Sequence, residues 1–275
     1  MFYEMIDIII FSGQSNMQGQ SDALTDTSMV AGAMEYKWCS DSTTPLFNPV
    51  GENITTAHTQ GSAVTASTNL TTWLSNHVRG SACYGYTNLV PKFCENYIAQ
   101  TDRKVMAVHV AKGSTKIEYW IPGGAGYDIL VKKSNAAIGK AIELGYKIGK
   151  IYFVWLQGES DALAGNTTEY YKTQLTILCN HLKTQIGIHK FGIIRVGRFA
   201  EAIGAANAAE KDDAIMNAQD QICQENSDFV MLTTSAADMM SEAEYMNPKV
   251  VGHYSAKGLE KLGAEAGTAL GDIAK

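Results

Sequence analysis

The sequence contains little of what proteins use to bind nucleic acids or to enter membranes. Charged residues make up only 18% of its 275 residues, and 22 Lys and Arg against 28 Asp and Glu leave a formal net charge of −6. It has no block of basic residues, which binding to a phosphate backbone would require. The longest apolar runs, such as residues 151–156, fall far short of the roughly 20 residues that cross a bilayer. We therefore expect neither nucleic acid nor a membrane among its partners.

The cysteines are too few and too scattered to indicate a metal site or a disulfide framework. The five cysteines form no CxxC pair and are odd in number. Neither a zinc knuckle nor a complete set of disulfides is indicated by such a pattern. We expect buried or incidental thiols and no metal centre.

The N-terminal segment does not have the pattern of a secretion signal. Residues 1–11 carry Glu4 and Asp7 where a signal would carry Lys or Arg, and no small-residue cleavage site follows. We expect a strand here and a cytoplasmic location by default, with a secreted mature form or a virion-associated protein as alternatives.

Hydrophobic runs of strand length alternate with segments of helical periodicity, which is typical of βα units around a mostly parallel sheet. The expected strands are residues 6–11, 105–111, 151–156, 191–196 and 229–232. The expected helices are residues 89–98, 129–144, 170–186, 212–225 and 256–273. Several strands are apolar at consecutive positions, as in strands that helices cover on both faces. The sequence predicts an α/β fold, a three-layer α/β/α sandwich, in a single domain over residues 1–275.

Residues 19–81 differ in character from the rest of the chain. They are rich in Ser, Thr, Asn and Gly and show no sustained periodicity, so we expect a long irregular loop region there. A connection of this length is typical of a functional loop or an insertion that lies over a site. Trp38, Phe47 and Trp73 would either line a sugar-binding rim or only fix the loop to the body of the protein.

A turn of small residues, Gly13-Gln14-Ser15-Asn16-Met17, directly follows the first expected strand. Ligands of open α/β sheets bind at the carboxyl edge, so this turn would present Ser15 to a ligand. Ser15 would also lie at a helix N-terminus, where free backbone N–H groups can stabilise an anion. The alternative is that Ser15 only caps that helix.

A second group of polar residues, Gln157-Gly158-Glu159-Ser160-Asp161, follows the third expected strand after six apolar residues. This strand ends at the same sheet edge as the Ser15 turn. The Gln157 amide could donate to a developing oxyanion, while Glu159 and Asp161 could orient the site or cap the next helix. A solvated acidic loop would also account for the Glu and Asp, but not for the Gln-Gly pair.

A third block, Val251-Gly252-His253-Tyr254-Ser255, lies immediately before the last expected helix. A histidine in that loop can reach the sheet edge from the opposite end of the chain and act as a general base toward a serine hydroxyl. We assign surface, core or supporting positions to the other five histidines, which are His58, His77, His109, His181 and His189.

The three blocks, residues 13–17, 157–161 and 253–255, resemble in this order the signature blocks of the SGNH-type sialate O-acetylesterase-like carbohydrate esterases. Residues 84–86 and 111–114 also fit the layout of that family. The resemblance covers most of the chain except residues 19–81. It implies the SGNH hydrolase fold, with a flavodoxin-like central sheet.

The resemblance implies that Ser15 is the nucleophile and His253 the base that activates it. One position departs from the family, which commonly has Asp three residues before the histidine, where this chain has Val250. Either a backbone carbonyl near Val250 orients the imidazole in a Ser-His dyad, or a carboxylate from elsewhere replaces the Asp. The candidate carboxylates are Asp238, Glu242, Glu244 and Glu159. We favour the dyad, because a carbonyl can fix the tautomer although it stabilises the imidazolium less.

The resemblance also implies an oxyanion hole made of the backbone N–H groups of Ser15 and Gly85 and the side-chain amide of Gln157. Gly113 is a weaker candidate for the same hole. Loss of one such donor typically raises the barrier by about 2.7–4 kcal/mol, because charge builds on the carbonyl oxygen as the tetrahedral intermediate forms.

We therefore predict a serine esterase that hydrolyses O-acetyl groups on a carbohydrate, such as a sialic acid or an acetylated polysaccharide, without a cofactor. Glu159 and Asp161 would support the site without a chemical role. The alternative is a weakly active or inactive carbohydrate-binding or structural module of the same fold, for example in a surface or viral assembly. A lipid esterase is disfavoured, because residues 19–81 lack a long apolar stretch to hold an acyl chain.

Overall fold

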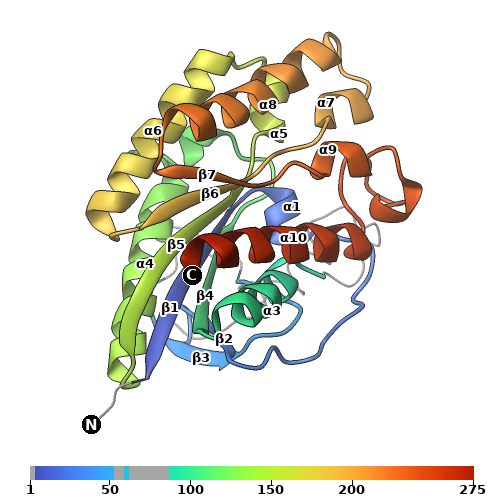
Figure 1. The fold of residues 1–275 in the computed structure, drawn as a ribbon. Helices are drawn as coiled ribbons and strands as arrows, with labels where there is room; N and C mark the ends of the chain where they lie inside the picture. Colours follow the sequence, from blue (N-terminus) through green and yellow to red (C-terminus); the bar gives the residue numbers. More distant parts are fainter. Residues whose placement is uncertain (1–3, 53–58, 62–86) are drawn as a thin grey trace.

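The computed structural model describes residues 4–52, 59–61 and 87–275 (Figure 1). Gly85, Trp73, His58, His77 and Cys83 lie outside these residues. Four cysteines lie within them, of which Cys39, Cys94 and Cys179 are buried and Cys223 is partly buried. None of the helices in this part of the chain is long and apolar enough to cross a membrane.

A seven-stranded sheet forms the centre of the molecule, in the order β3-β2-β4-β1-β5-β6-β7. The five strands expected from the sequence are β1 (Met5–Gly13), β4 (Lys104–Ala111), β5 (Lys147–Leu156), β6 (Lys190–Ile194) and β7 (Phe229–Thr233). All are parallel to their neighbours, and in chain order they are arranged 2-1-3-4-5. This is the flavodoxin-like order, whose switch point lies at the carboxyl end of the first strand. The predicted sheet is therefore confirmed.

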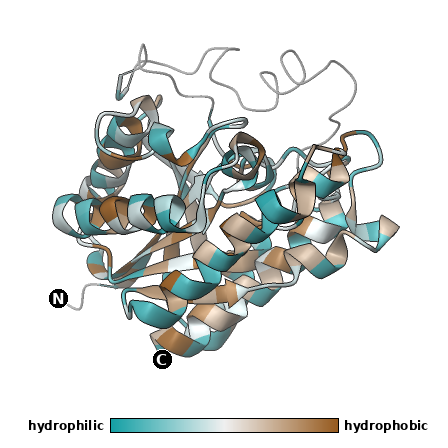
Figure 2. Ribbon diagram, turned by 90° about the horizontal axis from the view of Figure 1, so that it is seen from above, coloured by the Kyte–Doolittle hydropathy of each residue, from teal (hydrophilic) through white to brown (hydrophobic). Residues whose placement is uncertain are grey.

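Helices cover both faces of the sheet, which confirms the predicted sandwich of three layers (Figure 1). One face packs against α3 (Val90–Thr101) and α10 (Ala256–Ala274), and the other packs against α4 (Ala125–Glu143), α6 (Thr168–Gln185) and α8 (Ala208–Glu225). Figure 2 shows hydrophobic and hydrophilic residues alternating along these helices, as expected where one side of each helix meets the sheet.

The prediction of an irregular region over residues 19–81 is wrong for its first part. Strand β2 (Ala33–Lys37) extends the sheet beside β4, and β3 (Ser42–Pro45) pairs with β2 in an antiparallel hairpin. The strand pattern is hidden in the sequence because β2 carries Glu35 in a buried position, where an apolar residue would be expected. The Glu35 carboxylate is accommodated by an ion pair with Lys37, at 2.8 Å, and by the backbone N–H of Gly51, also at 2.8 Å.

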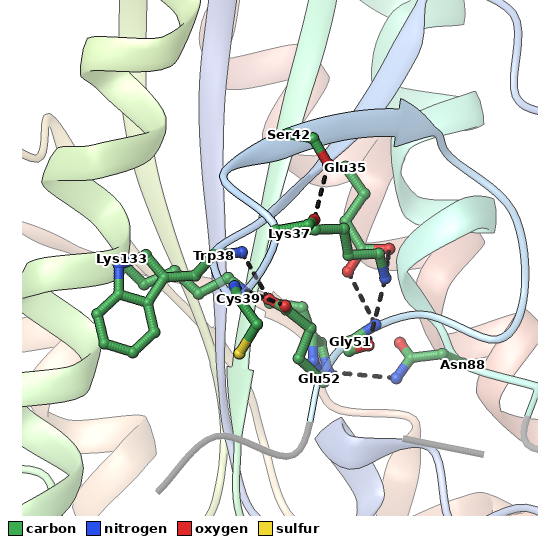
Figure 3. A network of polar contacts seen from close by, with 11 residues as sticks. Glu35, Lys37, Trp38, Cys39, Ser42, Gly51, Glu52, Asn88 and Lys133 are labelled. Atoms are coloured by element: carbon green, nitrogen blue, oxygen red, sulfur yellow. Dashed lines mark hydrogen bonds and ion pairs between the residues drawn. The ribbon is translucent and has the colours of Figure 1, made fainter. Parts of the chain in front are cut away.

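A buried ion pair ties the loop after this hairpin to helix α4 (Figure 3). The carboxylate of Glu52 accepts hydrogen bonds from the backbone N–H groups of Trp38 and Cys39 and lies 2.6 Å from Nζ of Lys133, which is fully buried. Burial by itself would raise the pKa of Glu52, but the Lys133 ammonium and the two N–H groups outweigh it and hold the pKa below its usual value. Trp38, in the turn between β2 and β3, is buried and so fixes that turn to the body, whereas Phe47 is 37% exposed.

The ion pair predicts a large effect of one substitution in α4. Lys133→Met would leave the Glu52 carboxylate buried without its cation, and we expect a loss of about 3–5 kcal/mol in the free energy of unfolding. The neighbouring Lys132 is exposed, so Lys132→Met should change this free energy by no more than about 0.5 kcal/mol. Urea denaturation of both variants tests the prediction, and equal effects of the two substitutions would contradict it.

Candidate active site

The turn that carries Ser15 passes close against the end of strand β5. Gly13 has φ +150°, and a Cβ placed on it would lie 1.9 Å from the backbone oxygen of Leu156. The next residue, Gln14, donates its backbone N–H to that same oxygen at 3.1 Å. Only glycine fits at position 13, and the turn therefore begins α1 (Ser15–Gln18) at the carboxyl end of β1.

Two side chains fix α1 in place by donating hydrogen bonds to the carbonyl oxygen of Met17. Nδ2 of Asn88 and Nε2 of His109, on β4, each lie 2.8 Å from that oxygen. Because a carbonyl only accepts, the proton of the His109 ring is on Nε2. Burial lowers the pKa of His109 to about 4, so the ring stays neutral while it supports α1. A supporting position is one of the three, surface, core or supporting, that the sequence analysis left open for this histidine.

His253 reaches the same edge of the sheet from the loop before α10. Its Nε2 lies 2.9 Å from Oγ of Ser15, and both residues are buried. The loop is fixed on both sides of the histidine, by an isolated bridge between Met246 and Tyr254 and by Ser255, whose hydroxyl caps α10. Ser15 and His253, which the sequence analysis singled out, are thus brought together.

The other ring nitrogen of His253, Nδ1, lies 3.0 Å from the backbone oxygen of Val251. Nδ1 therefore carries the proton, which leaves the lone pair of Nε2 directed at the Ser15 hydroxyl. Of the candidate carboxylates, Glu244 pairs with Lys257 and Glu159 bonds with Asn16. Burial lowers the pKa of His253, and the Val251 carbonyl acts in the opposite direction.

Ser15 and His253 line a cavity of about 730 Å³. Its polar wall comes from amide, hydroxyl and ammonium groups of Gln14, Gln20, Ser114, Ser160 and Lys249, and Gly113 contributes backbone. Its apolar wall consists of Leu163, Phe199, Ile203, Val250 and Val251. The Phe199 ring also meets the His253 ring edge to face, with the ring centres 5.8 Å apart. A cavity with one polar and one apolar wall suits a ligand that has both hydroxyl groups and C–H surfaces.

Gln157 does not take the oxyanion position expected for it. Its side chain is fully buried and does not line the cavity. Its Nε2 lies 2.6 Å from Oδ2 of Asp161, 2.8 Å from the Thr115 carbonyl and 3.2 Å from Oε1 of Gln14. Its Oε1 accepts from the Tyr171 hydroxyl at 2.8 Å. With its two amide protons directed at acceptors within the protein, Gln157 braces the floor of the site instead of facing a substrate.

Gly113 approaches Ser15, but its N–H donates a hydrogen bond elsewhere in the protein. A Cβ on Gly113 would lie 3.6 Å from Cβ of Ser15, while its N–H donates to Oε1 of Gln18 at 3.0 Å. Gln20 donates to the same oxygen at 3.1 Å and lines the cavity. Among the described residues, the backbone N–H of Ser15 is the expected oxyanion-hole donor that is still available. The first N–H groups of a helix have no partner within that helix.

The two carboxylates after β5 are both buried below the site. Asp161 accepts from Gln157, from Nδ2 of Asn166 at 2.7 Å and from the N–H of Ile117 at 3.0 Å, and burial raises its pKa to about 6. Oε1 of Glu159 accepts from Nδ2 of Asn16 at 2.8 Å, and burial raises its pKa as well. Neither lines the cavity.

Sequence reasoning did not assign roles to Gln20 or Phe199. Gln20 lies three residues after the Ser15 block, within a run of amide side chains from residue 14 to residue 20, and that run was a usable signal. Phe199 comes from α7 (Phe199–Ala202), a short helix after β6 that no periodicity indicated.

Solved structures of other proteins share the fold of this chain. The chain is similar in structure to NanS, with 13% identity, 100% of this chain and 98% of that chain covered, and a TM-score of 0.62. It is also similar to a protein from Arabidopsis thaliana (16% identity, 98% and 97% covered, TM-score 0.58) and to a lipase/acylhydrolase from Enterococcus faecalis (13%, 97% and 96%, 0.50). These likenesses identify the SGNH hydrolase fold. No curated protein matches the sequence.

One family model matches nearly the whole sequence. The model of the carbohydrate esterases described as sialic acid-specific acetylesterases matches residues 5–270, which include the Ser15, Gln157 and His253 blocks. The chain therefore belongs to this family and is a carbohydrate acetylesterase.

Proposed function

We propose that Ser15 is the nucleophile and His253 its general base in the removal of O-acetyl groups from a carbohydrate, either a sialic acid or an acetylated polysaccharide. The observation that carries the proposal is the 2.9 Å contact between Oγ of Ser15 and Nε2 of His253 at the cavity wall. A hydroxyl and a neutral imidazole at this distance are in position for direct proton transfer.

The reaction follows from the protonation state of the imidazole. Oγ of Ser15 attacks the acetyl carbonyl carbon as its proton passes to Nε2 of His253, and negative charge develops on the carbonyl oxygen. The imidazolium then gives that proton to the departing sugar oxygen, which breaks the ester bond and leaves the acetyl group on Ser15. Water attacks this ester, with His253 again as base, and acetate is released.

The Val251 carbonyl takes part of the role that an Asp has in a triad. Its oxygen lies 3.0 Å from Nδ1 of His253 and accepts the Nδ1 proton, which fixes the tautomer in which Nε2 can accept a proton. Because a carbonyl carries no full charge, it stabilises the imidazolium less than a carboxylate does. The lowered pKa of His253 agrees with this environment, since neither its burial nor the carbonyl supplies a negative charge.

The cavity supports a carbohydrate substrate more than a long acyl chain. The Gln20 amide and the Ser114 and Ser160 hydroxyls can exchange hydrogen bonds with sugar hydroxyls. Phe199 and Ile203 offer apolar surface for the acetyl methyl group and for the C–H face of a sugar ring.

The nucleophile assignment predicts the effect of removing one oxygen atom. Ser15→Ala should abolish acetate release from an acetylated sugar, a fall in kcat/KM of at least about 10³-fold, because no acetyl-enzyme can form. Acetate release from O-acetylated sialic acid and from an acetylated polysaccharide provides the measurement, with octanoyl esters as the comparison for a lipid esterase.

The matched control is Ser241→Ala, which removes an exposed hydroxyl that does not line the cavity. Full acetate release by the Ser15→Ala variant would contradict the proposal. If, in addition, an organophosphonate did not label Ser15 of the wild-type protein, and that protein still bound the sugar, the protein would be a binding module.

The proposed base predicts the pH dependence of the rate. His253 accepts the serine proton only when neutral, and its pKa lies below the usual 6.5 of a histidine. As pH falls through that pKa the base becomes protonated, so kcat/KM should decrease on the acid side with a midpoint below pH 6.5. A pH profile of hydrolysis of an uncharged acetyl ester provides the measurement, and a midpoint above the usual histidine value would speak against this environment of the ring.

A further inference from the structure

Asn16 connects the two chain segments that carry the proposed dyad. It directly follows Ser15 in the chain, and its Oδ1 accepts from the backbone N–H of Tyr254, the residue after His253, at 3.3 Å. Its Nδ2 donates to Oε1 of Glu159 at 2.8 Å. The side chain is 2% exposed, so these protein groups are its partners in place of water.

Glu159 is an unusual choice for this position. It is the first residue of α5 (Glu159–Ala164), is 2% exposed, and its second oxygen, Oε2, is buried without a hydrogen-bond partner among the described residues. A buried carboxyl group of this kind destabilises the folded state unless its contacts compensate for the lost hydration. The hydrogen bond between Glu159 and Asn16 is therefore the contact that explains why a carboxyl group is buried here.

We propose that Glu159 is a positioning residue, whose carboxyl group holds the Asn16 amide in the one orientation that ties the Ser15 turn to the His253 loop. The inference rests on the proposed function for its kinetic consequence. Glu159 does not line the cavity and acts only through Asn16.

The donor and acceptor pattern of the amide explains why an orienting partner is needed. An Asn side chain can present its oxygen or its nitrogen to either side, and the two differ in hydrogen bonding. In the observed orientation an acceptor faces the Tyr254 N–H and a donor faces Glu159. In the reversed orientation, Nδ2 would meet the Tyr254 N–H and Oδ1 would meet the Glu159 carboxyl group, so the Tyr254 bond would be lost. The carboxyl group thus selects the orientation in which the two loops are joined.

This role requires an acceptor at position 159 and not a full negative charge. One oxygen of the Glu159 carboxyl group accepts from Asn16, and the other has no hydrogen-bond partner among the described residues. Glutamine has nearly the same shape and also offers one acceptor oxygen, whereas leucine offers none. Position 159 therefore allows the acceptor to be removed or kept in separate variants.

The first experiment compares Glu159→Leu with Glu159→Gln. A 1 Å displacement at a catalytic group can reduce a rate by about 10²-fold, so we expect Glu159→Leu to lower kcat on an acetyl ester by about 10- to 100-fold while KM changes by less than about 2-fold. Glu159→Gln should retain kcat within about 5-fold, because its oxygen still accepts from Asn16. Equal kcat values for the two variants would overturn the proposal.

The second experiment exchanges donor and acceptor between the two positions. Asn16→Asp alone places two carboxyl groups face to face, and we expect kcat to fall by about 10²-fold. In the double variant with Glu159→Gln, the new amide at position 159 can donate to one oxygen of the new carboxylate at position 16. The other oxygen of that carboxylate still accepts from Tyr254, and kcat should recover at least about 10-fold over the single variant. A folded double variant with no recovery would also overturn the proposal.

Two further measurements separate positioning from folding and from the proposed function. Asp7, a fully buried carboxylate at the opposite end of β1, accepts from the Tyr97 hydroxyl and the Lys150 N–H. Asp7→Asn should lower the Tm and leave kcat unchanged. Hydrogen exchange at the Tyr254 amide should accelerate in Glu159→Leu but not in Glu159→Gln, whether or not the protein cleaves an ester. An absence of Ser15-dependent hydrolysis in the wild type would refute the proposed function, while an unchanged Tyr254 exchange rate in Glu159→Leu would refute the positioning role.

Discussion

The contact between Oγ of Ser15 and Nε2 of His253 is the interaction that the rest of the structure supports. It joins residues that are 238 positions apart in the chain. Ser15 is placed by the end of the central strand β1, and His253 by the start of α10, which packs on α3 at one face of the sheet. A contact of 2.9 Å across such a separation depends on the folded sheet and on the helical layer that carries α10. The buried core of the protein is therefore also the support of its site.

Neutral hydrogen-bonding groups dominate the surroundings of this contact. Amide side chains from residue 14 to residue 20, the Val251 carbonyl and the His109 ring hold the turn and the imidazole. The carboxyl groups of Glu159 and Asp161 are buried one layer deeper, where each accepts from an amide. This composition agrees with the low charge of the chain. It also fits a reaction on an uncharged acetyl ester, in which charge appears only during the reaction.

Much of the fold could be predicted because its signals are local. The five core strands and five long helices each have a periodicity that belongs to the element itself, and all were found within a few residues of their ends. The hairpin of β2 and β3 was missed, because Glu35 and Lys37 are made compatible with a buried strand by each other and by Gly51, a partner the local pattern does not contain. The site also divides into a part that was predictable and a part that was not. The sequence located its blocks of polar residues, but it did not predict the direction of each side chain.

The sequence by itself determined that Ser15 and the residues from 157 to 161 directly follow two strands, and that His253 directly precedes the last helix. Only the tertiary structure decided which of their hydrogen-bonding groups face the cavity. The Gln157 amide is directed to the Thr115 carbonyl, 42 positions away, and the Gly113 N–H to Gln18, 95 positions away. It also decided that a backbone carbonyl, and not a carboxylate, lies against Nδ1 of His253. Each hydrogen bond depends on a distance and an angle between segments remote in the chain, and no local pattern of residues encodes these.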